Sequence, residues 1–191
     1  MNFIQDFTNQ IHELSPESLL LFKNLTTLKR FPKDSIFIED GVTTNKFYII
    51  KSGIARGYIT DEKGKEHTKV LFFPVTTFGS LAALIKNKPS ETAYDCLTDC
   101  IMYEGNFPEF IELTEKHHDI ATFYTKILEI VFLTVEKRIN ELTTLNATER
   151  YLKLKKRIPE IDNLIPQYHI ASFLNVTPVQ LSRIRKELYS K

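Results

Sequence analysis

The chain of 191 residues is poor in cysteine and has no apolar run of membrane-spanning length. Its two cysteines, Cys96 and Cys100, exclude a disulfide framework and fit the reducing cytoplasm. The best apolar stretch, residues 127–135, is short and contains Glu129, so no membrane span is expected. Residues 1–14 lack the basic region and apolar block of a secretory signal. We therefore expect a cytoplasmic protein with no membrane partner.

The sequence also lacks the patterns that metal and catalytic sites need. Its five histidines contain no His-x-His pair, and the adjacent His117 and His118 would point apart on a helix. There is no nucleophile–base arrangement and no glycine-rich loop followed by lysine. Cys96 and Cys100 could form a redox pair or ligate a metal, but a buried structural role is favoured. We expect no enzyme activity, no catalytic residue, no metal site and no cofactor.

What the chain does have is an ordinary globular composition with an uneven charge. Hydrophobic residues make up 42% and charged residues 26%, which is enough apolar material for a core. Residues 147–191 carry nine Lys or Arg against four acids and are therefore +5, whereas the whole chain is +1. A basic C-terminal unit on a mildly acidic body suits phosphate binding, and a solvated helix face is the alternative.

The first half of the chain changes from helical to strand periodicity. Residues 3–24 predict two short helices, with Ser15 as the N-cap of the second and Pro16 at its first position. From Leu28 onward, short β-branched and aromatic runs are separated by turn residues, which favours an antiparallel barrel or jelly roll. Residues 61–65 form a polar hairpin tip, and residues 98–99 are expected to turn another hairpin.

Two further helices follow the strands. A helix over 119–146 carries two apolar stripes, so we expect it to pack on its own domain and on a second copy of the chain. The alternative is a helix fully buried within one chain. The expected dimer seam consists of Tyr124, Leu128, Val131 and Val135. A second helix over 149–158 ends at Pro159, and a short polar linker follows.

The C-terminal stretch "IASFLNVTPVQLSRIRKEL" predicts two helices joined by a tight turn. Thr177 as N-cap, Pro178 at the first helical position and Gln180 at the third form the start signal of a new helix. A first helix over 167–174 ends before Asn175, which tolerates the left-handed conformation of such turns. The pattern is that of a helix-turn-helix, although any helical hairpin could share its apolar spacing.

The expected core of this unit leaves one face of the second helix free. Core residues would be Ile170, Leu174, Val176, Leu181 and Ile184, with Ala171 where the helices cross. A major groove accepts one helix, and a basic face suits a polyanion. The residues that we expect at the DNA are Thr177, Val179, Gln180, Ser182, Arg183, Arg185 and Lys186.

The order of these parts resembles the Crp/Fnr family of bacterial transcription regulators. "KFYIIKSGIARGYI", "TTFGSLAALIKNKPSETAYDCLTDCIMYEG" and "LNATERYLKL" resemble its strand-Gly-strand segment, its phosphate-binding cassette with the following hairpin, and the start of its DNA-binding domain. The resemblance implies a homodimer on a two-fold double-stranded DNA operator. It divides the chain into a cyclic-nucleotide-binding-like sensor (1–118), a long dimerisation helix (119–146) and a helix-turn-helix domain (147–191). The expected fold is α+β: an N-terminal antiparallel, jelly-roll-like β-roll with flanking helices, then the long helix and a helix-turn-helix lacking a full wing.

Departures from the family pattern concern the effector. Cyclic-AMP-binding members of the family carry Phe-Gly-Glu and then Arg-Ser-Ala, where this chain has Ser80 for the glutamate and "ETA" at 91–93. Lys86 and Lys88 are poorer substitutes for the missing arginine. We expect control by an unknown small molecule, or a pocket filled by side chains, rather than by cyclic AMP. The candidate pocket residues are Phe78, Gly79, Ser80, Leu81, Glu91, Thr92 and Ala93.

Three functions remain in order of preference. The first is a dimeric, sequence-specific transcription regulator. The second is a ligand-binding β-roll whose C-terminal helices bind a protein partner, which salt-dependent DNA binding would distinguish from the first. A β-roll enzyme of the cupin type is the weakest, because its metal-binding histidine cluster is missing.

Overall fold

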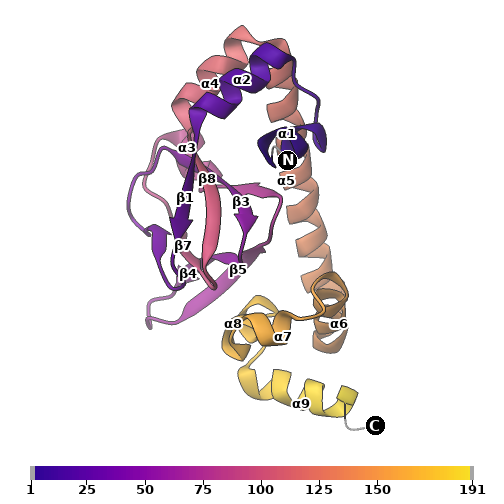
Figure 1. Cartoon of the computed structure of the whole chain (residues 1–191). Coiled ribbons are helices and arrows are strands. Elements are labelled where there is room, and N and C mark those ends of the chain that lie inside the picture. Colours follow the sequence, from indigo (N-terminus) through magenta and orange to yellow (C-terminus); the bar gives the residue numbers. More distant parts are fainter. Residues whose placement is uncertain (1–2, 190–191) are drawn as a thin grey trace.

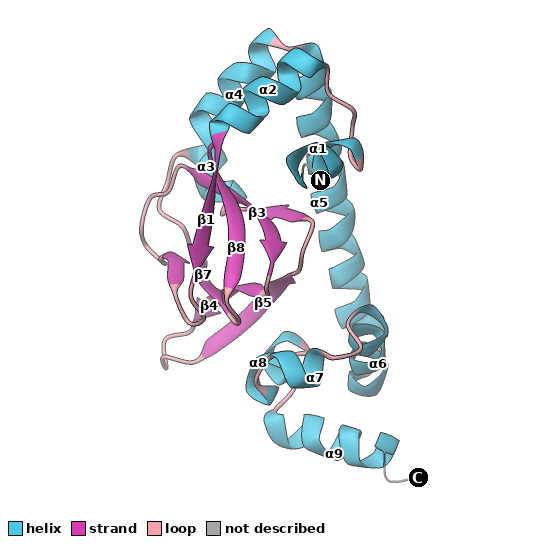
Figure 2. Cartoon of the chain, in the orientation of Figure 1, coloured by secondary structure: helices cyan, strands magenta, loops and turns pink. Residues whose placement is uncertain are grey.

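The computed structural model describes residues 3–189 and confirms the predicted α+β class. A β-roll lies alongside one long helix, and the C-terminal helices lie beneath the roll (Figures 1 and 2). The helices are α1 (Phe3–Asn9), α2 (Pro16–Leu25), α3 (Leu81–Lys86), α4 (Phe107–Lys116), α5 (His118–Thr144), α6 (Ala147–Arg157), α7 (Ile161–Leu164), α8 (Gln167–Phe173) and α9 (Pro178–Tyr189). The strands are β1 (Thr26–Phe31), β2 (Ile36–Ile38), β3 (Lys46–Ser52), β4 (Ala55–Thr60), β5 (Glu66–Phe72), β6 (Thr76–Phe78), β7 (Ala93–Cys96) and β8 (Cys100–Asn106).

The two N-terminal helices begin where the sequence predicts and are tied to α5. The hydroxyl of Ser15 accepts a hydrogen bond from the Ser18 backbone N–H at 3.2 Å, which caps α2. Asp119, in the first turn of α5, accepts bonds from the Ser15 N–H (2.8 Å) and the Ser18 hydroxyl (2.7 Å). The aromatic rings of Phe22 and Phe123 pack edge to face 5.4 Å apart, so α2 and α5 share a core.

The roll consists of two four-stranded antiparallel sheets, in the orders β1-β8-β3-β6 and β2-β7-β4-β5. Residues 61–65 join β4 to β5 as the predicted hairpin tip, closed by the Asp61 N–H on the Lys65 carbonyl at 2.9 Å. The predicted hairpin at residues 98–99 is wrong. β7 and β8 lie in different sheets, so this turn carries the chain from one sheet to the other. Side chains of both strands pack in the one interior that the two sheets enclose.

Aromatic side chains fill the interior of the roll. Phe78 stands at the centre, with its ring 4.0 Å from that of Phe72, 6.0 Å from Tyr48 and 6.3 Å from Tyr94. Phe37 packs on the same group, 4.9 Å from Tyr48. Cys96 and Cys100 lie in this cluster as buried free thiols, and Cys100 donates to the Ile54 carbonyl at 3.4 Å.

The apolar packing of helix α5 lies in its first half, whereas its second half contacts the C-terminal helices through polar side chains. Ile120 and Phe123 are fully buried, whereas most apolar side chains beyond residue 130 are exposed. No described helix combines the length and hydropathy needed to cross a membrane.

The segment predicted as a polar linker after Pro159 contains a short helix, α7. Its Ile161 is fully buried in the core of the C-terminal helices. The sequence did not predict this burial, because the residues next to Ile161 are polar. α6 begins with a complete capping box, in which Asn146 accepts from the Glu149 N–H at 3.0 Å and Glu149 accepts from the Asn146 N–H at 2.8 Å.

The C-terminal helices and the roll share one hydrophobic core. Apolar side chains from the roll meet side chains of α6 to α9 in a single buried cluster. The roll contributes Ile54, Leu71, Phe73 and Leu97. The helices contribute Tyr151, Leu154, Ile161, Ile165, Ile170, Ala171, Leu174, Leu181 and Ile184. The helix-turn-helix is therefore fixed on the roll of its own chain.

Candidate DNA interface and effector pocket

The turn between α8 and α9 has the predicted chemistry. The Thr177 hydroxyl accepts from the Gln180 N–H at 3.2 Å, and the Gln180 amide oxygen accepts from the Thr177 N–H at 2.8 Å. This capping box begins α9 at Pro178, whose missing N–H costs nothing at that position. Asn175 has φ of 55°, so it adopts the left-handed conformation expected of it. The proline thus begins a second helix instead of interrupting one.

The predicted core of the helix-turn-helix is confirmed. Ile170, Ala171, Leu174, Leu181 and Ile184 are buried, and Val176 packs against them. The Val176 N–H donates to the Ala171 carbonyl at 3.0 Å, which holds the turn against the end of α8. Burial of these side chains fixes the rotation of α9 about its axis and therefore decides which face reaches solvent.

The exposed face of α9 carries Val179, Ser182, Arg183 and Lys186, which recur at intervals of three, four and seven residues. All four are solvent-exposed, and the Val179 side chain is 60% exposed. Among residues 3–189, neither Arg183 nor Lys186 has an ion-pair partner. These residues form one free, basic surface, which we name the α9 face.

Two further predicted DNA residues have partners within the protein. Gln180 uses its amide oxygen in the capping box, so its amide N–H groups are what it can offer to a ligand. Arg185 lies 3.7 Å from Asp162, which also pairs with Lys155 at 3.0 Å and accepts from the Tyr151 hydroxyl at 2.7 Å. Arg185 therefore ties α9 to α6 and α7, and it is not on the α9 face.

A shallow groove runs beside the α9 face. Its walls are the start of α6 and the outer side of α9. The lining residues are Asn146, Ala147, Thr148, Gln180, Arg183, Ile184 and Glu187. The beginning of α6 is thus brought next to the basic end of the motif, although 30 residues of sequence separate Thr148 from Pro178.

The candidate effector residues come together around α3. The Ser90 hydroxyl donates to the Ser80 hydroxyl at 2.8 Å, and the Thr92 N–H donates to Ser90 at 3.3 Å. The Tyr94 hydroxyl donates to the Gly79 carbonyl at 3.2 Å, and burial raises the pKa of Tyr94 to about 12. These bonds close the cassette on itself with buried hydroxyl groups. Phe78 and Ala93 are buried and Leu81 is half-buried.

Two charged residues of this region differ from the sequence-based picture. Glu91 is exposed, whereas its neighbour Thr92 is buried and faces the cassette. The Lys69 ammonium group donates to the Thr92 hydroxyl at 3.2 Å, so β5 supplies a cation that sequence reasoning missed. The pairing of β4 with β5 brings Lys69 next to Thr92. A single lysine within a strand sequence does not indicate which residue it will contact.

The predicted dimer seam is only partly exposed. Tyr124 packs on Phe107 and Phe110, with ring centres 6.2 and 5.5 Å away, so its partners lie in its own chain. Leu128 and Val131 are half-buried, and Val135 is 52% exposed. The expected seam left out three exposed apolar residues that continue the stripe: Phe132, Ile139 and Leu142. We name Leu128, Phe132, Val135, Ile139 and Leu142 the α5 stripe, since their intervals of four, three, four and three are those of a helix-to-helix seam.

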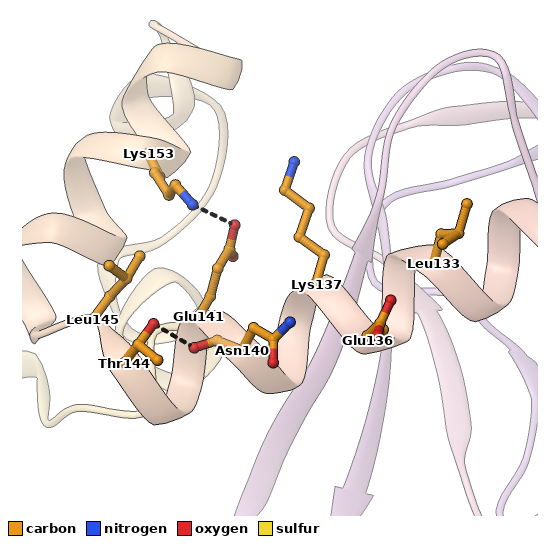
Figure 3. Close-up of a pocket in the computed structure, with 8 residues that line it drawn as sticks. All are labelled: Leu133, Glu136, Lys137, Asn140, Glu141, Thr144, Leu145 and Lys153. Atoms are coloured by element: carbon orange, nitrogen blue, oxygen red, sulfur yellow. Dashed lines mark hydrogen bonds and ion pairs between the residues drawn. The ribbon is translucent and has the colours of Figure 1, made fainter.

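A second hollow lies where α5 meets α6 (Figure 3). Glu141 from α5 and Lys153 from α6 form an ion pair of 3.1 Å across it, and Lys137 extends along the same side. The lining residues are Leu133, Glu136, Lys137, Asn140, Glu141, Thr144, Leu145 and Lys153. This ion pair links the first helix of the C-terminal unit to α5.

Helix α8 is held on β5, the edge strand of the second sheet. The Thr68 N–H donates to the Ser172 hydroxyl at 2.9 Å, which in turn donates to the Glu66 carbonyl at 3.4 Å. Beneath this contact, the buried Arg56 makes two bonds of 2.8 Å to Asp95 and a further one to Glu66. The edge of the sheet is therefore covered by α8 of the helix-turn-helix.

Buried polar groups complete the joint between the two parts. His169 on α8 is 5% exposed, and its Nδ1 atom has no hydrogen-bond partner within the described residues. Burial, followed by the charge of Arg56, lowers the pKa of His169 to about 4. At the end of α8, Arg138 donates to the Phe173 carbonyl and lies 4.1 Å from its ring, while Arg150 donates to the Leu174 carbonyl at 3.1 Å.

Comparison with known proteins agrees with this architecture. Residues 28–117 match the family model described as "Cyclic nucleotide-binding domain". No curated protein sequence matches the chain. The structure of FixK2 from Bradyrhizobium japonicum is 16% identical, with a TM-score of 0.71 over 86% of this chain and 85% of the other.

Two further solved structures are similar. The regulator CLP from Xanthomonas campestris, described as c-di-GMP responsive, is 15% identical with a TM-score of 0.71 over 92% of each chain. A Eubacterium rectale protein, described within the Crp/Fnr family, is 15% identical with a TM-score of 0.72 over 91% of this chain and 83% of that one. The chain is therefore Crp/Fnr-like in fold, with a cyclic nucleotide-binding domain as its N-terminal part.

Proposed function

We propose that this Crp/Fnr-like chain is a dimeric, DNA-binding transcription regulator that is not controlled by cyclic AMP in the family's usual way. The observation that carries the proposal is the α9 face, a basic and otherwise unoccupied helix surface that follows a capped tight turn. In this proposal, residues 1–118 sense, the helix over 119–146 dimerises and residues 147–191 bind DNA.

The α9 face suits DNA better than a protein partner. Arg183 and Lys186 present two free cations on one side of a single helix. The major groove is wide enough to admit one such helix. Arginine can bond bidentately to the O6 and N7 atoms of guanine, and lysine neutralises a phosphate. The alternative, a protein-binding tail, gives no reason for two adjacent turns to expose positive charge without an acidic residue between them.

The α5 stripe supports the dimer. Its exposed members, Phe132, Val135, Ile139 and Leu142, would leave a continuous apolar strip in water if the chain were a monomer. A second copy packed along the same helix would cover both strips at once, since a two-fold axis pairs identical surfaces. The two α9 helices would then read two half-sites of one operator.

The cassette argues against a buried cyclic phosphate. Such a ligand needs a compensating cation, because burying an unpaired charge costs several kcal/mol. Lys69 is the one cation bonded to a cassette side chain among the described residues, and its partner is the neutral Thr92. The aromatic cluster around Phe78 occupies the interior of the roll, which favours an apolar effector or none.

The test is selection of a binding sequence from random duplex DNA by the purified full chain. A selected two-fold motif, with affinity that falls steeply as salt rises, would support the proposal. Arg183→Ala should cost about 1–3 kcal/mol and relax one position of the motif. Lys63→Ala, at the hairpin tip of the roll, is the matched control because it removes one exposed cation and should change neither. No selected motif, or no salt dependence, would favour the protein-binding alternative.

A further inference from the structure

We propose that Val179 is a specificity-determining residue that reads the 5-methyl group of a thymine in each half-site of the operator. The inference rests on the proposed DNA-binding function and deepens it. It concerns a residue that contributes neither charge nor a hydrogen bond, and that a search for basic residues alone would pass over.

The first observation is the position of Val179 on the helix. Of the apolar residues in the first two turns of α9, Leu181 and Ile184 are buried in the shared core, whereas the Val179 side chain is 60% exposed. Val179 lies on the α9 face three and four residues before Ser182 and Arg183. An exposed valine is a poor helix former and does not pack into the core, so its side chain is free to contact a ligand.

The second observation is the shortage of hydrogen-bonding groups around it. Pro178 has no backbone N–H, and the Gln180 oxygen is held by Thr177 at 2.8 Å. The leading turn of the helix therefore presents the Val179 side chain and, as its only free side-chain polar group, the amide N–H groups of Gln180. The polar groups of the α9 face begin one turn later, at Ser182 and Arg183. In a helix that enters the major groove by its N-terminal end, this leading turn lies against the base edges.

Base chemistry then selects the partner. Thymine alone carries a methyl group in the major groove, and apolar side chains recognise it by contact. Valine opposite the amino group of cytosine would leave that donor without an acceptor. A cytosine at this position would therefore lose the methyl contact and also leave a buried donor unpaired. Arg183, four residues on, suits guanine at a neighbouring base pair. Each half-site should therefore contain a thymine at a fixed distance from a guanine.

The decisive experiment removes only the methyl group. In the duplex selected by the full chain, each thymine is replaced in turn by deoxyuridine, and affinity is measured at constant salt. Replacement at the Val179 position should weaken binding about fourfold per half-site, the worth of one buried methyl group. The other thymines of the same duplex serve as controls and should change affinity less than twofold.

Protein variants assign the effect to the side chain. Val179→Ala should reduce the fourfold ratio between the thymine and deoxyuridine duplexes, because the shorter side chain covers less of the methyl group, while Ser182→Ala should keep the ratio. Val179→Glu should turn the preference at that position from thymine to cytosine, because glutamate accepts from the cytosine amino group. Each variant changes an exposed side chain, and an unchanged thermal midpoint will show that the fold is intact.

The outcomes separate this inference from the function beneath it. A selected, salt-sensitive motif without any position where thymine and deoxyuridine differ would overturn the role of Val179 and leave DNA binding intact. A Val179→Ala variant that keeps the parent ratio would overturn that role in the same way. Failure to select any motif would overturn the proposed function and this inference together.

Discussion

The hydroxyl of Ser172, on the first helix of the helix-turn-helix, accepts a hydrogen bond of 2.9 Å from the backbone N–H of Thr68, on the edge strand of the roll. Residues 104 positions apart are thus joined by one side chain, which also donates to the Glu66 carbonyl. The contact gives the Thr68 N–H, on the unpaired edge of β5, a hydrogen-bond partner where α8 covers it.

Removal of this bond should loosen the joint. We expect Ser172→Ala to lower the free energy of unfolding by about 1 kcal/mol, because the Thr68 N–H loses its partner in a partly buried place. Urea denaturation measures the change. Ser182→Ala, on the exposed α9 face, is the matched control and should stay within about 0.5 kcal/mol of the parent. Equal stability of the two variants would mean that Ser172 contributes nothing to the joint.

The buried Arg56 should be among the most sensitive positions of the roll. Arg56→Met leaves Asp95 in the interior without its cation, for which we expect a loss of about 3–5 kcal/mol. Adding Asp95→Leu should restore much of that loss, since both charges are then gone. A double-mutant cycle in urea gives the coupling between the two residues. Additive losses would show that the ion pair is not what stabilises this place.

Acid should weaken the joint through His169. Its pKa is lowered from 6.5 to about 4 by burial and by Arg56, and only partly opposed by Asp95, Glu66 and Asp34. The unfolded chain therefore binds a proton that the folded chain refuses between pH 6.5 and pH 4. Above pH 6.5 His169 is neutral in both states and does not change the free energy of unfolding. As the pH falls towards 4, the free energy of unfolding decreases by roughly 2–3 kcal/mol.

Comparison of stability curves checks that sign. His169→Gln should flatten the decline of stability between pH 6.5 and pH 4, whereas the exposed His118→Gln should leave it unchanged. A parent curve that rises towards acid, or one that both variants alter equally, would contradict the assignment to His169.

The dimer prediction is testable on the α5 stripe. Val135→Glu together with Ile139→Glu places two charges in the expected seam, so we expect monomers in sedimentation and loss of operator affinity. Val131→Glu with Val135→Glu should act in the same direction. Leu20→Glu, a similar change at a 58%-exposed position of α2, is the control and should stay dimeric. Sedimentation of the parent as a monomer at micromolar concentration would end the proposal.

Cyclic nucleotides should bind weakly at most. Titration calorimetry with cyclic AMP and cyclic GMP should give no low-micromolar dissociation constant, since neutral Ser80, Ser90 and Thr92 bond to one another where a phosphate would need a cation. Low-micromolar binding that also tightens DNA binding would contradict the prediction and show that the cassette does accept a cyclic phosphate.

The sequence carried local information well. Caps at Ser15 and Thr177, the left-handed Asn175 and the apolar spacing from Ile170 to Ile184 each fix a neighbour within a few residues, and all four were predicted correctly. Such signals depend on backbone chemistry that a short window contains.

Long-range relationships were not predictable from the same windows. The turn at residues 98–99 has hairpin composition, yet it changes sheets because both flanking strands share one interior. The predicted seam began at Tyr124 because an apolar stripe does not reveal which of its members α4 covers. Lys69 and Ser172 act across 23 and 104 residues of chain, and only strand pairing and helix docking bring them to their partners.

The core that Leu71, Phe73 and Leu97 share with the C-terminal helices makes the helix-turn-helix depend on the roll for its stability, so it is not a transferable module. A chain cut after residue 146 would leave these side chains in water, and the excised helices would lose the same apolar cover. Both parts should therefore unfold in one cooperative event. Any change that destabilises the roll should therefore destabilise α9 as well, even when it moves no atom of that helix directly.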